Sequence, residues 1–179
     1  MDNYNNDIAT TTDDKLLTTL FKNPKNAEKA YDFLISEGYD KNDITVIMSD
    51  ETRNKNFIGA DIPHESLASK AVEGMGVGGA IGGTIGAIAA AVAAIGTTLA
   101  VPGLGLVIAG PIAAAFAGAG AGSAVGGMIG ALAGAGIPAE QAKLYEDEIK
   151  TGGILIGVKA SNQKYNNLEN ELNRMNSFI

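Results

Sequence analysis

The feature that most constrains this chain is a stretch of 66 consecutive residues, 74–139, without a formally charged side chain. The whole sequence contains 13 basic and 20 acidic residues, and all of them lie outside this stretch. An average stretch would have about a quarter of its residues charged. Nineteen of the 24 glycines also fall between Gly74 and Gly136. This stretch therefore separates two charged flanks and is expected to avoid water.

Two sets of glycines recur at every fourth position within the stretch. This spacing places them on one ridge of a helix, where the missing side chains let another backbone approach closely. Between the sets, Pro102, Gly103 and Gly105 have strong turn chemistry. The sequence thus predicts an antiparallel helical hairpin, with helices over 74–99 and 111–136. The predicted helix-packing residues are Gly74, Gly78, Gly82, Gly86, Gly118, Gly122, Gly126, Gly130 and Gly134.

The composition of this glycine zipper favours a membrane environment. Each glycine costs about 1 kcal/mol relative to alanine in a helix in water, whereas a bilayer offers the backbone no alternative to helical hydrogen bonds. A helix of 26 residues is about 39 Å long and can cross a hydrocarbon core of about 30 Å. Lys70 and Lys143 flank the outer ends of the hairpin. The positive-inside rule then places both termini in the cytoplasm, at the cytoplasmic membrane.

A cytoplasmic alternative remains open, because alanine and glycine are only weakly hydrophobic. The stretch contains 18 Val, Ile, Leu or Phe residues among 66, a marginal signal for insertion. In this alternative the hairpin is buried inside a soluble oligomer.

The N-terminal flank predicts a compact βαβ unit. Residues 16–21 are strand-like, and Asn23-Pro24 is an N-cap followed by proline at the first helical position. Ala27, Ala30, Tyr31 and Leu34 recur at helical spacing, Gly38 ends the helix, and residues 44–48 form a second strand. Residues 49–63 are expected to be a loop.

The C-terminal flank predicts a helix after Pro138 and a strand over 154–158, with Gly152-Gly153 between them. Together the flanks predict an α+β fold, a small ferredoxin-like (βαβ…αβ) domain split by the helical hairpin. From Tyr165 to Ile179, apolar residues recur at helical spacing. This pattern predicts an amphipathic C-terminal helix that packs on its own domain or binds a partner or a membrane surface.

These elements define five segments. They are a disordered tail over 1–14, the first half of the α+β domain over 15–63, the glycine-zipper hairpin over 64–136, the second half of the domain over 137–160 and the amphipathic helix over 161–179.

Several chemistries are disfavoured by composition. The chain has no cysteine and a single histidine, His64, so neither a disulfide nor a Cys/His metal site is predicted. A net charge of −7 argues against nucleic acid as a partner. Residues 74–79 match G-x-G-x-x-G, but no strand precedes them and no acidic residue follows at the required distance. We therefore predict no cofactor, no catalytic residues and no enzymatic activity.

Both flanks resemble a known family. The segments 26–30 (NAEKA) and 38–47 (GYDKNDITVI) resemble the opening of the bacterial heat-induced general stress protein family of the YflT type. Residues 136–160 (GIPAEQAKLYEDEIKTGGILIGVKA) look like its close, so the resemblance covers residues 15–160. It implies a stress-associated protein with an α+β domain split by a Gly/Ala-rich segment, and it implies no catalytic residues.

The resulting expectation is a non-enzymatic, stress-associated protein whose partners are membrane lipid and further copies of itself. Self-association would use the glycine-zipper helices. The alternative is a soluble oligomeric sensor that binds an unidentified small molecule at its α+β domain. A membrane-permeabilising or pore-forming protein is a third hypothesis, which the scarcity of polar residues in the stretch disfavours.

Overall fold

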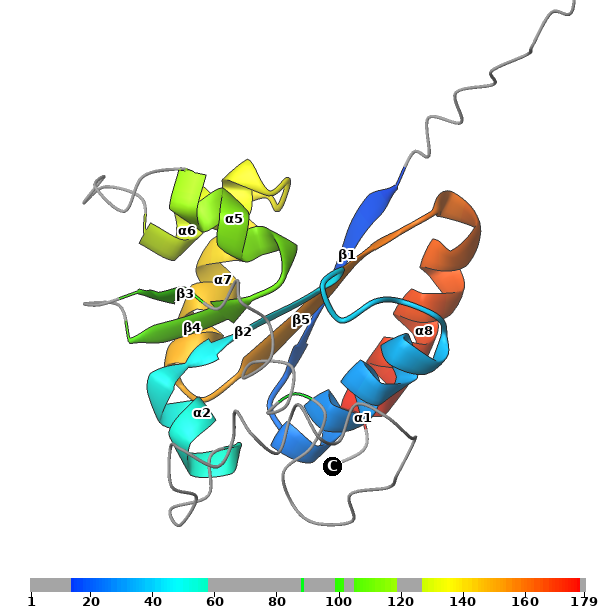
Figure 1. The fold of residues 1–179 in the computed structure, drawn as a ribbon, viewed down its shortest axis with the longest axis horizontal. Helices are drawn as coiled ribbons and strands as arrows, with labels where there is room; N and C mark the ends of the chain where they lie inside the picture. Colours follow the sequence, from blue (N-terminus) through cyan, green and yellow to red (C-terminus); the bar gives the residue numbers. More distant parts are fainter. Residues whose placement is uncertain (1–13, 58–87, 89–98, 102–104, 119–126, 178–179) are drawn as a thin grey trace, which may run out of the picture.

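The computed structural model describes residues 14–57, 88, 99–101, 105–118 and 127–177, which form an α+β structure. Figure 1 shows one sheet with helices on both of its faces. The strands are β1 (Lys15–Phe21), β2 (Ile44–Ser49), β3 (Leu99–Val101), β4 (Leu106–Ala109) and β5 (Ile154–Ala160). The helices are α1 (Pro24–Ser36), α2 (Asp50–Asn56), α5 (Pro111–Gly118), α6 (Gly127–Gly134), α7 (Ala139–Lys150) and α8 (Asn162–Ser177). The predicted tail lies outside the described residues, apart from Asp14.

The sheet has five strands in the order β1-β5-β2-β4-β3, and every neighbouring pair is antiparallel. Because β5 is antiparallel to both β1 and β2, these two strands run parallel with β5 between them. The βαβ unit predicted from the N-terminal flank is therefore present, but the last strand of the chain is inserted into it.

Helix α1 begins and ends where its local sequence predicts. The Asn23 side-chain oxygen accepts a hydrogen bond from the Lys25 backbone N–H at 2.9 Å, and Pro24 opens the helix. The predicted inward face, Ala27, Ala30, Tyr31 and Leu34, is buried. Gly38 follows the helix with φ of +91°, which satisfies the need for a left-handed residue there.

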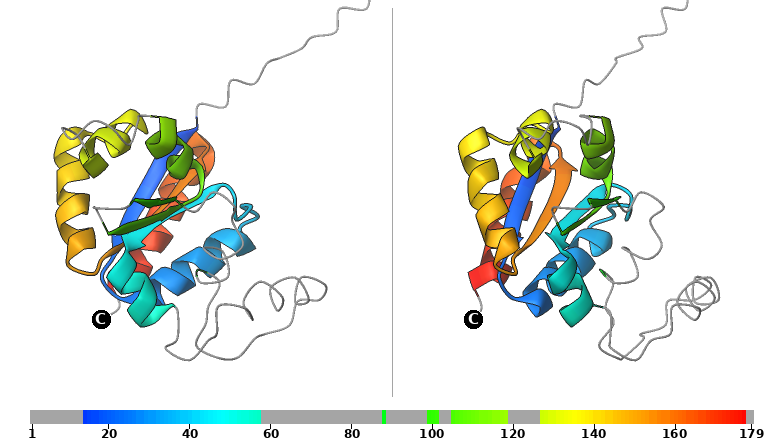
Figure 2. Two further views of the ribbon diagram at one scale, coloured as in Figure 1. Left: turned by 60° about the vertical axis from the view of Figure 1, so that its left-hand side comes forward. Right: turned by 90° about the vertical axis from the view of Figure 1, so that its left-hand side faces the viewer.

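Helices cover both faces of the sheet (Figure 2), and successive strand residues alternate between two cores. On β5, Ile154, Ile156 and Val158 belong to the core under α1 and α8, whereas Leu155 belongs to the core under α5, α6 and α7. On α7 the predicted inward residues Ala142 and Ile149 are fully buried in the second core. Helix α8 packs back on the domain through Leu168 and Leu172, as the first of its three predicted roles requires.

The predicted helical hairpin is wrong at its turn. Pro102, Gly103 and Gly105 were expected to join two helices, but the chain forms strands on both sides of them, and β3 pairs with β4. Gly105, with φ of +59°, lies in the turn, and its carbonyl accepts a hydrogen bond from the Asp50 backbone N–H at 2.7 Å. The physical reason is that β4 pairs with β2 and puts its apolar residues into both cores. The sheet thus includes residues that were assigned to an insertion.

The second predicted helix, over 111–136, is also wrong as a single helix. In one continuous helix Ile112 and Leu132 would lie about 30 Å apart along the axis. In the structure α5 and α6 instead pack against each other, and both residues are buried in the same core. Pro111 is the first residue of α5, directly after Gly110.

A smaller difference concerns residues 49–63, whereas Ile88, within the first predicted helix, is helical. Residues 50–56 were expected to be a loop, but they form α2, because the Ser49 hydroxyl caps it by accepting from the Thr52 N–H at 3.1 Å. Ile88 is the one described residue between 58 and 98. It is buried against α1, and its backbone N–H donates to the Glu28 carboxylate at 3.4 Å.

Gly110 is predicted to be indispensable for the fold. Its φ is +88°, and a β-carbon at this position would lie 2.2 Å from the Ile44 carbonyl oxygen. We expect Gly110→Ala to lower the free energy of unfolding by at least about 2 kcal/mol, measured by urea denaturation. Gly130→Ala is the matched control, since Gly130 is an exposed helical position with open space around it. The control should leave stability unchanged or raise it by up to about 1 kcal/mol.

A second prediction concerns Tyr31, which is only 2% exposed. Within the described part of the chain, its hydroxyl has no hydrogen-bond partner. Burial, reinforced by the nearby Asp40, Asp32 and Glu28 carboxylates, raises the pKa of Tyr31 to about 12. The unfolded chain releases this proton near pH 10 and the native chain only near 12, so native stability should fall between these values.

Tyr31→Phe should therefore lose less stability than the parent between pH 10 and 12. At pH 7 its free energy of unfolding should equal that of the parent or exceed it by about 1 kcal/mol, because a buried hydroxyl without a partner is removed. Urea denaturation at several pH values measures both. A variant that is clearly less stable at pH 7 would show that the hydroxyl is satisfied.

Candidate functional site

Most of the sequence-predicted packing residues lie outside the described part of the chain. Those outside it are Gly74, Gly78, Gly82, Gly86, Gly122 and Gly126, together with Pro102 and Gly103 of the expected turn. The G-x-G-x-x-G match and His64 also lie outside it. The described members of the second ladder are Gly118, at the end of α5, and Gly130 and Gly134 on α6.

On α6 the ladder forms an open ridge. Large side chains point inward, with Met128 and Leu132 buried in the core under α5, α6 and α7. The ladder residues Gly130 and Gly134 are exposed, as is Gly127, which is outside the ladder, and a β-carbon built on any of the three would have no neighbour within 4 Å. In the described part of the molecule the ridge therefore faces no other helix, unlike the predicted contact between two ridges.

The next helix also has an exposed apolar side chain. Leu144 of α7 is 65% exposed, although α6 and α7 pack closely together. Exposed apolar groups that gather beside a charge-free surface often mark an interaction site. We refer to Gly127, Gly130, Gly134 and Leu144 as the α6–α7 surface.

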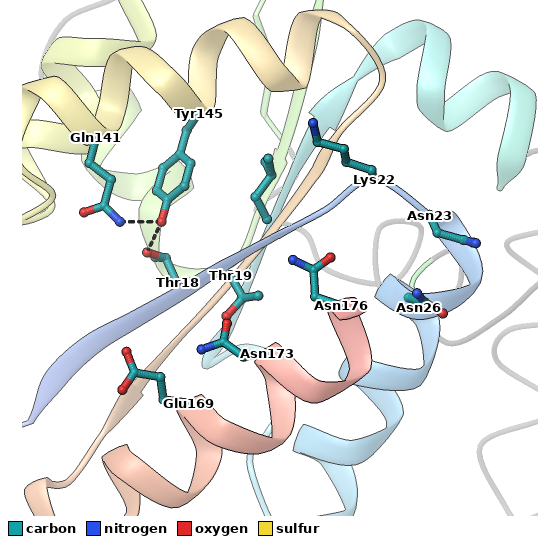
Figure 3. Close-up of a pocket in the computed structure, with 11 residues that line it drawn as sticks. Thr18, Thr19, Lys22, Asn23, Asn26, Gln141, Tyr145, Glu169, Asn173 and Asn176 are labelled. Carbon is teal, nitrogen blue, oxygen red and sulfur yellow. Dashed lines mark hydrogen bonds between the residues drawn. The ribbon is translucent and has the colours of Figure 1, made fainter. Parts of the chain in front are cut away.

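A second candidate site is a groove along strand β1, which sequence reasoning missed. It has a volume of about 790 Å³ and lies between α7 and α8 (Figure 3). Thr18 and Thr19 of β1 form its floor, Gln141 and Tyr145 of α7 form one wall, and α8 supplies the other. The remaining lining residues are Leu20, Lys22, Asn23, Asn26, Glu169, Asn173 and Asn176.

A chain of hydrogen bonds ties β1 to α7 on the first wall. The Gln141 amide nitrogen donates to the Tyr145 hydroxyl at 2.6 Å, and the Tyr145 and Thr18 hydroxyls are 3.0 Å apart. Because the tyrosine hydroxyl already accepts from Gln141, its single proton is best placed to bond Thr18. The Thr18 hydroxyl proton is then left for a partner in the groove.

Charge at the groove is sparse and largely compensated. Lys22 lies 3.0 Å from Glu148 of α7, and the lysine side chain is 74% exposed. Near the other end, burial raises the pKa of Tyr165, with Glu169 and Tyr145 adding to the effect. Side-chain amides and hydroxyls dominate the lining, and such groups both donate and accept. The groove is therefore suited to binding polar or backbone groups.

The only sign of this groove in the sequence is the pair Thr18 and Thr19, which interrupts the apolar run of the first strand. No local pattern indicated that β1 would be the outer strand, or that α7 and α8 would flank it. Both depend on pairing between β1 and a strand more than 130 residues later in the chain.

Comparison with known proteins adds no relative: no family model, no curated protein and no solved structure matches the chain. Among the residues that the structure describes, no helix has both the length and the apolar character needed to cross a bilayer.

The wall of the groove yields a testable expectation. Tyr145→Phe removes the hydroxyl shared by Thr18 and Gln141, and should lower the free energy of unfolding by about 1 kcal/mol. Urea denaturation measures the loss. Tyr165→Phe is the control, since no hydrogen bond of its hydroxyl is found among the described residues, and it should change stability much less. Equal losses in the two variants would contradict the role given to Tyr145.

Proposed function

We propose that this protein is a non-enzymatic interaction protein that associates with further copies of itself and with membrane lipid. The α+β domain is the scaffold, and the charge-free stretch supplies the contact surface. The observation that carries the proposal is the α6 ridge: the domain buries the large residues of α6 and leaves Gly130 and Gly134 outward with open space.

Packing physics supports self-association through such a ridge. Glycines on one helix face let a second helix approach closely, so that van der Waals contact and weak Cα–H hydrogen bonds accumulate. Since Met128 and Leu132 hold α6 on the sheet, the ridge is presented by a rigid support. Leu144 of the following helix, α7, is a further exposed apolar side chain.

The proposed lipid contact has a narrower basis than the predicted two-helix membrane hairpin. Helices α5 and α6, the described helices between residues 111 and 136, both contribute to the core of the domain. Contact with lipid then depends on the sequence of residues 74–98, which is free of charge and rich in glycine. A stress-associated role, the ferredoxin-like arrangement and the likeness to the YflT-type family stay predictions of the sequence.

The groove does not favour the alternative of a small-molecule sensor. Sites for small molecules are usually concave and mostly apolar, with a few polar groups that fix orientation. Here the lining is largely amide and hydroxyl, and it runs along a strand at the edge of the sheet. A polypeptide partner fits such a groove better.

The ridge is tested by Gly130→Leu, with Gly130→Ala as the matched control. Leucine would hold two ridges apart, and we expect self-association to weaken roughly tenfold or more, about 1.4 kcal/mol. Sedimentation velocity over a range of concentrations measures association, and flotation with anionic and neutral vesicles measures lipid binding. Neither variant should be less stable than the parent, because the side chain at 130 meets open space.

If Gly130→Leu associates as the parent does, the ridge is not the contact. If the parent neither associates nor floats with vesicles, the proposed function is wrong as a whole.

A further inference from the structure

The two outer strands of the sheet differ in how well they are protected against further pairing. Strand β3 is three residues long and is followed by Pro102, which cannot donate a backbone hydrogen bond. Strand β1 has seven residues, and its register with β5 is continuous from Lys15 to Phe21, so it contains no bulge. Proteins usually block an exposed edge with proline, a bulge, inward charge or a very short strand.

Strand β1 has none of these devices along its middle. Residues 16–21 contain neither a charge nor a proline, and the groove of about 790 Å³ leaves the strand accessible along Thr18, Thr19 and Leu20. Alternate residues of an antiparallel strand direct their N–H and C=O groups away from the neighbour they already pair with. The outer side of β1 therefore offers backbone hydrogen bonds to another strand.

We propose that this edge binds β1 of a second copy of the chain, antiparallel, with Thr18 opposite Thr18 on a two-fold axis. The inference rests on the proposed self-association and adds, beside the α6 ridge, a second place where two copies meet. The two sheets would join into one continuous ten-stranded sheet, with about six new backbone hydrogen bonds. Strand addition of this kind is a common mode of recognition at sheet edges.

The sequence of β1 is complementary to itself in this register. With Thr18 on the axis, Leu16 lies opposite Leu20 of the other copy, and Asp14 lies opposite Lys22. Each end of the joint then has one carboxylate beside one ammonium group, and Asp14 and Lys22 are both exposed in the single chain. Opposite charges across two strands stabilise their pairing, whereas like charges destabilise it.

Other registers fit less well. A shift of the axis by one residue, to Thr19, sets Leu16 against Lys22 and leaves Asp14 without a basic partner. A register centred between Thr18 and Thr19 would set side chains that point to opposite faces directly opposite each other, which antiparallel pairing does not allow, because strand side chains alternate with a period of two. Only in the register centred on Thr18 do all seven residues of β1 lie opposite β1 of the other copy. Only this register also sets Asp14 opposite Lys22 at both ends.

The helices beside the edge suit a paired strand. In the joined sheet α7 would adjoin its symmetry mate on one face, and α8 would adjoin its own on the other. The side-chain amides of Gln141, Asn173 and Asn176 line these walls, and they offer donors and acceptors to a second copy.

Cross-linking tests the axis directly. The chain has no cysteine, so Thr18→Cys introduces a single thiol, which lies opposite its own copy only in the proposed register. Opposed β-carbons in an antiparallel pair are about 4.5–5.5 Å apart, and a disulfide needs about 3.5–4.5 Å. A short bismaleimide, which spans a longer gap than a disulfide, should therefore convert most Thr18→Cys protein into covalent dimer. Asn54→Cys, on the exposed surface of α2, should stay monomeric under the same conditions.

Charge reversal gives a second test that does not depend on thiols. Lys22→Glu should weaken dimerisation in sedimentation velocity about tenfold, because two carboxylates then face each other at each end. Asp14→Lys combined with Lys22→Glu should restore it. Lys25→Glu, an exposed position on α1, makes the same change of charge away from the edge and should have no effect.

These outcomes separate this inference from the function proposed above. Absence of the Thr18→Cys dimer together with normal association of Lys22→Glu overturns the edge pairing, while the α6 ridge can still be the contact. Thr18→Cys dimers that form in a Gly130→Leu background support the edge independently of the ridge. A chain that is monomeric at every concentration overturns both.

Discussion

The pairing of β4 with β2 is the contact on which the rest of the structure depends. It brings Leu106–Ala109, four residues from the middle of the charge-free stretch, into the sheet. Val107 and Ala109 then face the core under α1 and α8, and Leu106 and Ile108 face the opposite core. Without this pairing β2 would be an outer strand, and α5 would have no strand to begin from.

The same pairing accounts for the unusual composition of the segment after β4. The chain turns at Gly110, where the backbone passes so close to Ile44 that no side chain fits. Helices α5 and α6 then cover the second face of the sheet with Ile112, Met128 and Leu132. A stretch that looks suited only to lipid is in part the cover of an ordinary core. The glycines of α6 are left on the outside, and this distribution of residues makes a contact surface possible there.

The two proposed contacts have different physical origins. The α6 ridge depends on side chains that are missing, and its strength would come from close packing. The β1 edge depends on backbone groups that the sheet leaves outward, and its specificity would come from register and end charges. A chain with two separate self-complementary surfaces can form assemblies larger than a dimer.

Several elements could be predicted from local sequence because their signals are local. Asn23-Pro24 and Gly38 bound α1, Gly152 ends α7, and the spacing of Leu168 and Leu172 marks the buried side of α8. Strands β1, β2 and β5 were found in the charged flanks from their apolar, largely β-branched runs. The α+β class was therefore predicted correctly.

Other features had no local signal that could decide them. The turn residues around Gly105 suit a β-hairpin as well as a helical hairpin, and a four-residue apolar run such as Leu106–Ala109 is compatible with either structure. The groove was not predicted at all, because its walls come from α7 and α8 and its floor from β1.

The sequence alone thus determined where charge is absent, which helices have an apolar side and where several of them begin and end, because these properties depend on neighbours a few residues apart. Only the tertiary structure decided that part of the charge-free stretch enters the sheet, that the α6 glycines face outward and that β1 is an outer strand. These three features depend on hydrogen bonds between strands that are far apart in the sequence. The choice of partners also decides which strand is left at the edge of the sheet.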